Sequence, residues 1–234
     1  MISVVIPAHN EEALLGATIG ALMPALRALL PDDGFEVVVV DDGSTDRTAE
    51  VAAAAGARVV PVNVRQIAGA RNAGAKAARG DALIFVDADT IVPLETLRQT
   101  LGALADGVSA GGAPAALPSP QPFWSRASWA PFQWGMVLLR LPGGAYMFMT
   151  RAAFDAAGGF DEQYFASEEI HFARALKRVG RFRMVRPHVV TSDRKFRLLG
   201  FRGMMREWAR LARRGRGALK DRRHLGLWYD KHRD

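Results

Sequence analysis

The chain has 234 residues, of which 49% are hydrophobic, and it carries a formal net charge of +7. This size and composition suit one large α/β domain with a sizeable core, followed by a tail. The absence of cysteine excludes disulfides, thiolate metal sites and a cysteine nucleophile. The sequence shows neither a signal-peptide pattern nor an apolar run long enough to span a membrane, so we expect a cytoplasmic protein.

The first half of the chain alternates short apolar runs with segments of helical periodicity. This alternation predicts right-handed βαβ units in an α/β fold, with a mostly parallel twisted sheet between flanking helices in a Rossmann-like three-layer arrangement. Pro7 should end the first strand, and Ser44 or Thr45 should cap the second helix. The expected strands are 2–6, 35–40, 58–62 and 82–86, and the expected helices between them are 14–29, 45–55 and 67–78.

Polar residues follow three of these strands directly. In an open α/β sheet, ligands bind outside the carboxyl ends of the strands, so we expect these side chains to share one site. Oxygen ligands of this kind suit Mg²⁺ or Mn²⁺, and such a cation would gather phosphate oxygens. The alternative is that each cluster only ends a strand or caps a helix. The clusters are His9 to Glu11, Asp41 with Asp42, and Asp87 with Asp89.

The second half of the chain is less regular. The segment 123–134 holds three tryptophans, Trp124 among them. These aromatic rings could stack on sugars, lie at a lipid interface or belong to a buried helix that packs across the sheet. The expected helices are 94–104, 151–156 and 168–179, and the expected strands are 108–112, 143–149, 181–185 and 189–190.

Glu168 and Glu169 open the predicted helix over 168–179. Ser167 can serve as its N-cap and the two carboxylates can complement the helix dipole, which is a sufficient structural role for the pair. The functional interpretation is that one carboxylate is a general base, which requires partial desolvation and a position within reach of a substrate hydroxyl.

Several motifs occur in an order that resembles the family 2 glycosyltransferases of GT-A fold. The resemblance spans about residues 2–200 and leaves the tail outside it. The motifs are Val5-Ile6-Pro7-Ala8-His9-Asn10-Glu11-Glu12, Val40-Asp41-Asp42-Gly43-Ser44-Thr45-Asp46, Gly69-Ala70-Arg71-Asn72-Ala73-Gly74, Asp87-Ala88-Asp89, Gly158-Gly159-Phe160-Asp161-Glu162 and Glu168-Glu169.

The resemblance implies that residues 1–105 bind a UDP- or GDP-linked nucleotide-diphosphate sugar. His9 and Glu11 would lie against the nucleoside. The other expected donor contacts are Asp41 to the base ring, Arg71 to base or phosphate, and Asp87 to ribose or sugar, with Pro7, Asp42 and Ala88 beside them. Asp89 would ligate Mn²⁺ or Mg²⁺, with Asp87 and His188 as further expected metal ligands.

The resemblance also implies an acceptor-binding half over residues 106–196. Trp124, Tyr146 and Arg194 are expected to contact the acceptor, which would be a hydroxyl on a lipid-linked or glycan molecule. Many relatives carry Glu-Asp where this chain has Glu168-Glu169, so Glu169 or Glu168 would be the base of a one-step inverting transfer. The Gln-x-x-Arg-Trp motif of processive synthases is absent, which favours transfer of a single sugar.

Residues 197–234 are expected to form a basic extension. From Arg194 to Asp234 the chain has 14 Lys and Arg against 4 Asp and Glu, whereas the preceding residues carry a net charge of −3. Apolar residues at steps of three or four predict an amphipathic helix, which suits an anionic membrane surface on the inner face of the membrane. The alternative is that its apolar stripe packs on the domain. No recognition motif accompanies the charge, so we expect no nucleic-acid partner.

Two other functional classes remain beside the leading one. A nucleotidyltransferase has a similar sheet, but the glycine-rich phosphate loop expected after its first strand is replaced by Pro7-Ala8-His9-Asn10-Glu11. A catalytically inert sugar-nucleotide or membrane-binding module would not require Asp87, Asp89 and the paired glutamates. The chain has no Gly-x-Gly-x-x-Gly and no Walker-type loop, so dinucleotide redox chemistry and ATP hydrolysis have little support.

Overall fold

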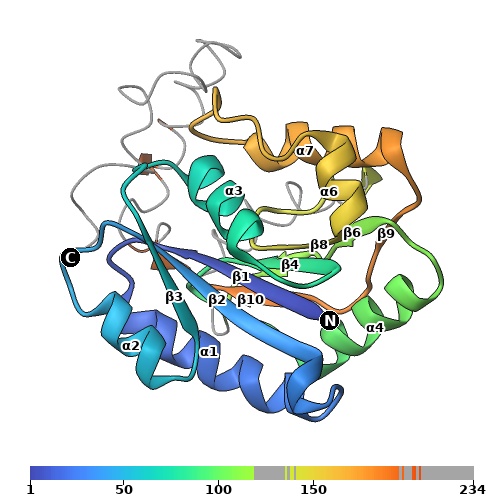
Figure 1. Ribbon diagram of the computed structural model, residues 1–234. Coiled ribbons are helices and arrows are strands. Elements are labelled where there is room, and N and C mark those ends of the chain that lie inside the picture. Colours follow the sequence, from blue (N-terminus) through green and yellow to red (C-terminus); the bar gives the residue numbers. More distant parts are fainter. Residues whose placement is uncertain are drawn as a thin grey trace.

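A computed structural model describes residues 1–118, 135, 138–139, 141–194, 197, 202–203 and 206. Within these residues the strands form a large sheet in the order β3-β2-β1-β4-β8-β6-β9 (Figure 1). A small sheet has the order β5-β10-β7. The strands are β1 (Ile2–Ala8), β2 (Phe35–Asp42), β3 (Arg58–Val62), β4 (Ala82–Val86), β5 (Thr90–Ile91), β6 (Ala110–Gly112), β7 (Ala115–Ala116), β8 (Tyr146–Thr150), β9 (Phe182–Met184) and β10 (Val189–Thr191).

Helices cover both faces of the large sheet, so the predicted three-layer α/β fold is confirmed. Figure 1 shows α3, α6 and α7 on one face and α1, α2 and α4 on the other. Strands β1 to β4 are parallel to one another, whereas β8 is antiparallel to both β4 and β6. The helices are α1 (Glu12–Arg27), α2 (Thr48–Ala54), α3 (Ile67–Ala77), α4 (Leu94–Ala105), α6 (Arg151–Ala157) and α7 (Glu168–Val179), with a 3₁₀ turn at Asp32–Gly34.

The protein has one hydrophobic core on each face of the large sheet, because successive side chains of a strand point to opposite faces. Val4 and Ile6 of β1 pack in the core under α1 and α4, whereas Val5 between them packs in the core under α3, α6 and α7. Strand β4 divides its side chains in the same way. Because both faces are buried, these strands read as continuous apolar runs, which is why their positions are predictable.

Gly74 lets α3 lie close to the sheet. A Cβ atom at this position would stand 2.3 Å from Val5 Cγ1 and 2.7 Å from Val40 Cγ2, distances that no real side chain tolerates. Helix α3 begins after β3, at the carboxyl-end edge of the sheet. This close approach therefore fixes Arg71, one turn before Gly74, at the edge where the site is expected.

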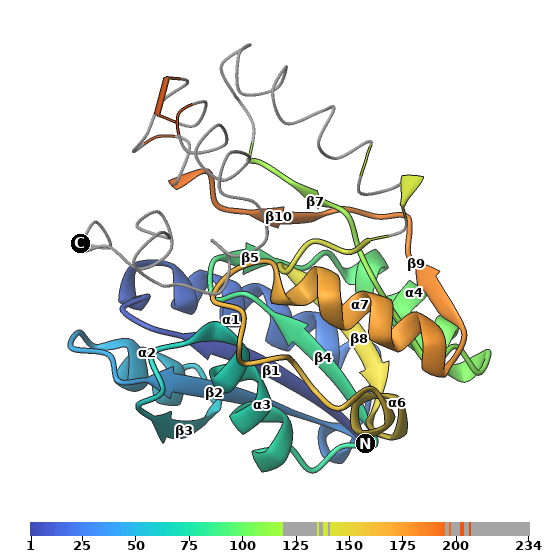
Figure 2. The same ribbon diagram turned by 90° about the horizontal axis from the view of Figure 1, so that it is seen from above.

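The small sheet is the main element that the sequence analysis missed. Strand β10 pairs antiparallel with β5, through Thr191 and Thr90, and parallel with β7. Figure 2 shows the three strands side by side beyond the carboxyl end of β4. Since β5 starts immediately after Asp89, the small sheet brings the residues that follow β10 to the expected site.

Two local expectations were wrong, and a third, Ser167 as N-cap, holds in position but not in its side-chain bond. Strand β1 runs through Pro7 to Ala8, which is possible because its ladder with β4 ends at Val5 and leaves that side of β1 unpaired. Helix α2 begins at Thr48, so neither Ser44 nor Thr45 caps it. Ser167 occupies the N-cap position of α7 but makes no side-chain capping bond there, and its backbone is left-handed with φ of 62°.

The aromatic segment with Trp124 lies outside the described residues, as does the predicted tail helix apart from residues 197, 202–203 and 206. None of the helices in the described part of the chain combines the length and the apolar character that crossing a membrane requires.

Candidate functional site

The loops that follow β1 and β2 are joined to each other, as expected for residues at one sheet edge. His9 Nδ1 lies 2.9 Å from the carbonyl oxygen of Asp42. The backbone N–H of Asn10 donates to Ser44 Oγ at 3.0 Å, and the N–H of Glu11 donates to Thr48 Oγ1 at 2.8 Å. These contacts form one wall of the candidate site.

Asp41 and Asp42 have different surroundings. The buried carboxylate of Asp42 accepts the backbone N–H groups of Val64, Arg65 and Gln66 at 2.7, 2.8 and 3.0 Å. Asp42 therefore holds the loop between β3 and α3. The carboxylate of Asp41 accepts the Ser44 N–H at 3.1 Å and remains partly exposed at the edge.

Pro7 and Ala88, both expected at the donor site, are buried. Pro7 belongs to β1, and the carbonyl oxygen of Ala88 accepts the Thr18 hydroxyl at 2.8 Å. Both residues therefore help to position the backbone and do not present side chains to a ligand. Ala88 anchors the turn between Asp87 and Asp89 to α1. The two carboxylates of this turn then reach different partners.

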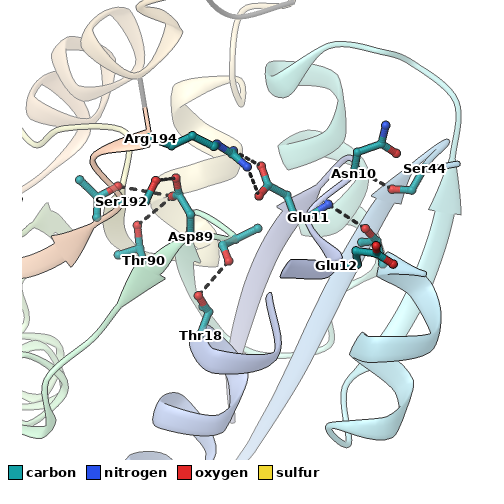
Figure 3. Close-up of polar contacts among 12 residues, drawn as sticks. Asn10, Glu11, Glu12, Thr18, Ser44, Asp89, Thr90, Ser192 and Arg194 are labelled. Atoms are coloured by element: carbon teal, nitrogen blue, oxygen red, sulfur yellow. Dashed lines mark hydrogen bonds and ion pairs between the residues drawn. The ribbon is translucent and has the colours of Figure 1, made fainter. Parts of the chain in front are cut away.

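Asp89 lies among hydroxyl groups from the small sheet. Ser192 Oγ donates to Asp89 Oδ2 at 2.8 Å, and the Ser192 N–H donates to the Asp89 carbonyl oxygen at 3.1 Å. Thr191 Oγ1 lies 3.4 Å from Asp89 Oδ1. Beside this group, Arg194 donates to both carboxylate oxygens of Glu11, at 2.7 and 3.1 Å (Figure 3). The structure thus unites two expected donor or metal residues with an expected acceptor residue.

The charge of Asp89 reaches Arg194. Burial opposes the guanidinium charge, but hydrogen bonding and the charges of Glu11 and Asp89 raise the pKa of Arg194 above its ordinary value. Arg194 is therefore a fixed positive charge between two carboxylates, in a segment that the β10 pairing holds against the turn after β4.

A divalent cation at Asp89 would need ligands from elsewhere. No cluster of three or more His, Asp or Glu suited to a metal occurs in the described part of the chain. Mg²⁺ often binds through one or two carboxylates together with substrate phosphates and waters. The oxygen donors around Asp89 fit that kind of site and do not fit a cage built from protein side chains alone.

His188 is not brought to Asp89. It precedes β10, whereas Ser192, which contacts Asp89, follows β10. Four residues of extended chain separate them, about 13 Å. His188 is exposed and lines a separate cavity of about 590 Å³ beside β9, with Arg181, Arg183 and Arg186 among its lining residues.

Arg71 is the centre of a buried charge cluster. Its Nη1 donates to Glu168 Oε1 at 2.5 Å, and its Nη2 donates to Asp87 Oδ1 at 2.8 Å and to the Gly144 carbonyl oxygen at 2.9 Å. Burial opposes its charge, but Asp87, Glu168 and Glu169 together raise the pKa of Arg71. The guanidinium is therefore charged although its side chain is only 3% exposed.

Glu169 stands next to this cluster, and within the described residues its carboxylate takes no part in the ion pairs that Arg71 makes with Asp87 and Glu168. Burial, reinforced by the negative charge of Glu168 and opposed by Arg71, raises the pKa of Glu169 from 4.5 to about 8. A raised carboxyl pKa near neutrality is the property expected of a general base or acid. Glu168, by contrast, is engaged by Arg71.

Tyr146 does not take the expected place at an acceptor site. Its side chain is fully buried, and its hydroxyl lies 2.9 Å from Thr100 Oγ1 of α4. Burial raises the pKa of Tyr146 far above its ordinary value, so the phenol stays neutral. The alternation along β8 turns this side chain toward α4 and away from the site. Trp124, the other aromatic candidate, lies outside the described residues.

Two amide side chains that the sequence analysis missed hold the loop before α7. Asn72 Nδ2 donates to the Phe160 carbonyl oxygen at 2.9 Å, and the Phe160 N–H donates back to Asn72 Oδ1 at 2.9 Å. Gln66 Nε2 donates to the carbonyl oxygens of Glu162 and Tyr164. The Arg71-Asn72 pair in the sequence could have suggested a second polar residue on the same helix, but its partners are distant in the chain.

Comparison with known sequences identifies a matching family and relatives that align with about half of this chain. The profile described as Glycosyl transferase family 2 matches residues 3–154. Validoxylamine A glucosyltransferase of Streptomyces hygroscopicus subsp. limoneus is 40% identical over 121 residues, which cover 49% of this chain and 25% of that protein. An undecaprenyl-phosphate 4-deoxy-4-formamido-L-arabinose transferase of Pseudomonas paraeruginosa is 40% identical over 119 residues, which cover 48% and 34%. The aligned part thus spans only a quarter to a third of these relatives.

Solved structures share the fold. Residues 1–349 of S. aureus TarS in complex with UDP superpose with a TM-score of 0.63 and 20% identity, covering 82% of this chain and 60% of that chain. Glucosyl-3-phosphoglycerate synthase from Mycobacterium tuberculosis, in complex with Mn²⁺, UDP and glucosyl-3-phosphoglycerate, has a TM-score of 0.58 and 26% identity, covering 86% and 75%. These likenesses confirm the GT-A type of the predicted fold.

Proposed function

The chain belongs to glycosyl transferase family 2, and from this premise we propose that it moves one sugar from a nucleotide-diphosphate sugar to an acceptor hydroxyl. The observation that carries the proposal is the position of Glu169. This carboxyl group, with its pKa raised to about 8, stands at the same sheet edge as Asp87, the carboxylate expected to hold the donor. A base and a donor anchor in one cluster are what direct transfer requires.

The proposed chemistry is a single displacement with inversion. Glu169 accepts the proton of the acceptor hydroxyl while the hydroxyl oxygen forms a bond to the anomeric carbon. The bond from that carbon to the diphosphate oxygen breaks, and the nucleoside diphosphate leaves with the bonding pair. Family membership and the position of Glu169, beside the Arg71 ion pairs but not part of them within the described residues, support this route over one in which a protein carboxylate first forms a covalent bond to the sugar.

Asp89 is the residue proposed to hold Mn²⁺ or Mg²⁺ together with the donor diphosphate. A cation bound there would neutralise negative charge that develops on the leaving group. The oxygen atoms around Asp89 support this assignment. The presence of Mn²⁺ beside UDP in the mycobacterial complex supports it as well. The chain's own contribution is to hold the Asp89 carboxylate through Ser192 and to keep Arg194 close to it.

We further propose a uridine nucleotide as the donor and a lipid-linked molecule as the acceptor. UDP is bound in the mycobacterial neighbour, which is 26% identical to this chain. The Pseudomonas relative is named for transfer involving undecaprenyl phosphate, a lipid carrier. A lipid-linked acceptor would be met at a membrane surface, and the net positive charge of residues 194–234 would favour an anionic one.

The test is a thermal-shift screen of UDP, GDP and their common sugar conjugates, with and without Mn²⁺. A ligand that binds only the folded state stabilises it by about 2.7 kcal/mol at one hundred times its dissociation constant. We expect a UDP compound to raise the melting temperature in the presence of Mn²⁺, and Asp89→Ala to lose that dependence on the metal. Asp33→Ala, at an exposed position before β2, is the matched control. No shift with any nucleotide would contradict the proposed donor site.

A further inference from the structure

The side chain of Arg71 is enclosed by four separate segments of the chain. It reaches the end of β4 through Asp87, the turn before β8 through the Gly144 carbonyl oxygen, and the start of α7 through Glu168. Its guanidinium carbon also lies 5.2 Å from the ring centre of Phe160, in the loop that Asn72 holds. All of these partners belong to the protein itself, and the contact with Glu168 is fully buried.

Only one member of this cluster is open to solvent. The side chains of Arg71 and Glu168 are 3% and 4% exposed, whereas that of Asp87 is 34% exposed. A donor molecule at the sheet edge could therefore contact Asp87 but could not reach the Arg71 guanidinium without displacing its partners. This burial does not suit the base or phosphate contact that the family resemblance implies for Arg71.

Stability alone gives little reason for such a cluster. Desolvation of buried charges offsets much of their attraction, and replacement of buried ion pairs by apolar side chains is often neutral or stabilising. Arg71 offers what apolar packing cannot, because its planar fork has a separate N–H for each carboxylate. One arm fixes the carboxylate at the end of β4, and the other fixes the first residue of α7.

Glu169 follows Glu168 directly and packs against the same turn. A Cβ atom on Gly144 would lie 3.2 Å from Arg71 Nη2 and 3.6 Å from Glu169 Cδ. Gly144 thus leaves just enough room for the guanidinium and the Glu169 carboxyl group to lie side by side. The left-handed backbone of Ser167 sets the direction in which α7 starts.

We infer that Arg71 is a positioning residue and not a donor ligand: it ties Asp87 to Glu168 and thereby sets where Glu169 stands relative to the donor sugar. This inference rests on the proposed function, in which Asp87 holds the donor and Glu169 is the base. It assigns Glu168 to positioning as well, since its carboxylate is committed to Arg71.

The test compares Arg71→Lys with wild type in two measurements. One is the dissociation constant of UDP with Mn²⁺, and the other is the turnover number for UDP release from common UDP-sugars with water as acceptor. Lysine keeps the positive charge but presents a single ammonium that cannot bridge both carboxylates in the same geometry. We expect turnover to fall about tenfold to a hundredfold, because misplacement by about 1 Å has this effect, while UDP affinity changes little. Arg98→Lys, on the exposed face of α4, is the control.

Glu168→Gln provides an independent variant that keeps the side-chain shape. It weakens the tie to Arg71 and should show the same signature, with turnover reduced and UDP affinity retained. This variant also carries the test if Arg71→Lys does not fold. A loss for Glu168→Gln larger than that for Glu169→Gln would make Glu168 the base and overturn its positioning role.

The remaining outcomes separate the inference from the proposed function. If Arg71→Lys weakens UDP binding and leaves the turnover number unchanged, Arg71 is a donor ligand and the inference is wrong. Wild-type turnover in both variants would also refute it and leave the proposed function intact. If wild type neither binds UDP nor releases it from any UDP-sugar, both fall together.

Discussion

Two arginines at the same sheet edge are used in opposite ways. Arg71 is 3% exposed and divides its fork between two carboxylates and a carbonyl, whereas Arg194 is 26% exposed and gives both arms to Glu11. The turn after β4 sends one carboxylate to each of them: Asp87 contacts Arg71, and the charge of Asp89 acts on Arg194. One turn therefore connects two clusters. The closed cluster consists of Arg71, Asp87, Glu168 and the adjacent Glu169, and the open cluster consists of Arg194, Glu11 and Asp89.

The difference shows which contacts a substrate can replace. Water and ligands cannot reach the Arg71 fork, so its contacts belong to the framework that places α7. The Arg194–Glu11 pair lies nearer to solvent, and an anionic ligand at Asp89 could compete for the same guanidinium. We therefore expect substitutions in the closed cluster to affect folding and turnover, and substitutions in the open cluster to affect mainly ligand binding.

The largest expected effect is a difference in the free energy of unfolding between variants of Arg71 and variants of Arg194. Arg71→Met leaves the buried carboxylate of Glu168 without its cation, and removal of one partner from a buried ion pair costs about 3–5 kcal/mol. Arg194→Met should cost less, because the loss of a partly exposed side chain opens Glu11 to water. Urea unfolding of both variants measures the free energies. Equal losses of unfolding free energy in the two variants would contradict the proposed difference between the closed and the open cluster.

The pH dependence should identify Glu169 within the closed cluster. Its pKa is about 8 in the folded state and near 4.5 when unfolded, so between these values the folded state holds the proton more tightly. Stability from this group is present below about pH 4.5 and is lost as the pH rises through about 8. Transfer requires the deprotonated form, so turnover should rise over the upper part of the same window.

Melting temperatures from pH 5 to about pH 9, for wild type and Glu169→Gln, measure this contribution. A shift of one pKa unit corresponds to about 1.4 kcal/mol. The wild type should lose stability relative to the Gln variant as the pH rises. A constant difference between the two proteins would mean that Glu169 titrates as an ordinary exposed carboxyl group.

The smallest expected effect concerns the space beside Arg71. Gly144→Ala would place a methyl group 3.2 Å from Arg71 Nη2 and 3.6 Å from Glu169 Cδ, so the two side chains must move apart slightly. We expect a several-fold fall in turnover with the fold retained. Gly143→Ala is the matched control, because a Cβ atom there meets nothing within 4 Å. Equal turnover in the two variants would show that the closed cluster can accommodate an added methyl group without displacing Glu169.

The sequence predicts which polar residues reach the sheet edge better than it predicts the partners that they meet there. Apolar runs that end in His9, Asp41 and Asp87 place these residues at one edge because strands buried on both faces have a clear pattern. Arg71 and Glu168 are 97 residues apart, and nothing local in either segment indicates that they meet. Likewise the small sheet, built from two- and three-residue strands, is too short to have a periodicity of its own.

Individual side chains show a second limit of sequence reasoning. Tyr146 was expected at the acceptor site, but the direction of a side chain on β8 depends on its register with β4, which pairs it with Val86. Asp42 follows Asp41 in the same motif, yet it is committed to three backbone N–H groups of a loop more than twenty residues later. Such partners are determined by tertiary packing.

The most direct test of the account is the behaviour of Glu169→Gln in UDP release from UDP-sugars, measured together with UDP affinity in the presence of Mn²⁺. Loss of a general base lowers turnover by about 10²–10⁴, and we predict a fall of this size with UDP affinity unchanged. Glu50→Gln, on the exposed side of α2, controls for removal of a carboxylate. Turnover close to that of wild type in Glu169→Gln would contradict the assignment of the base, and with it the reason that Arg71 holds the start of α7.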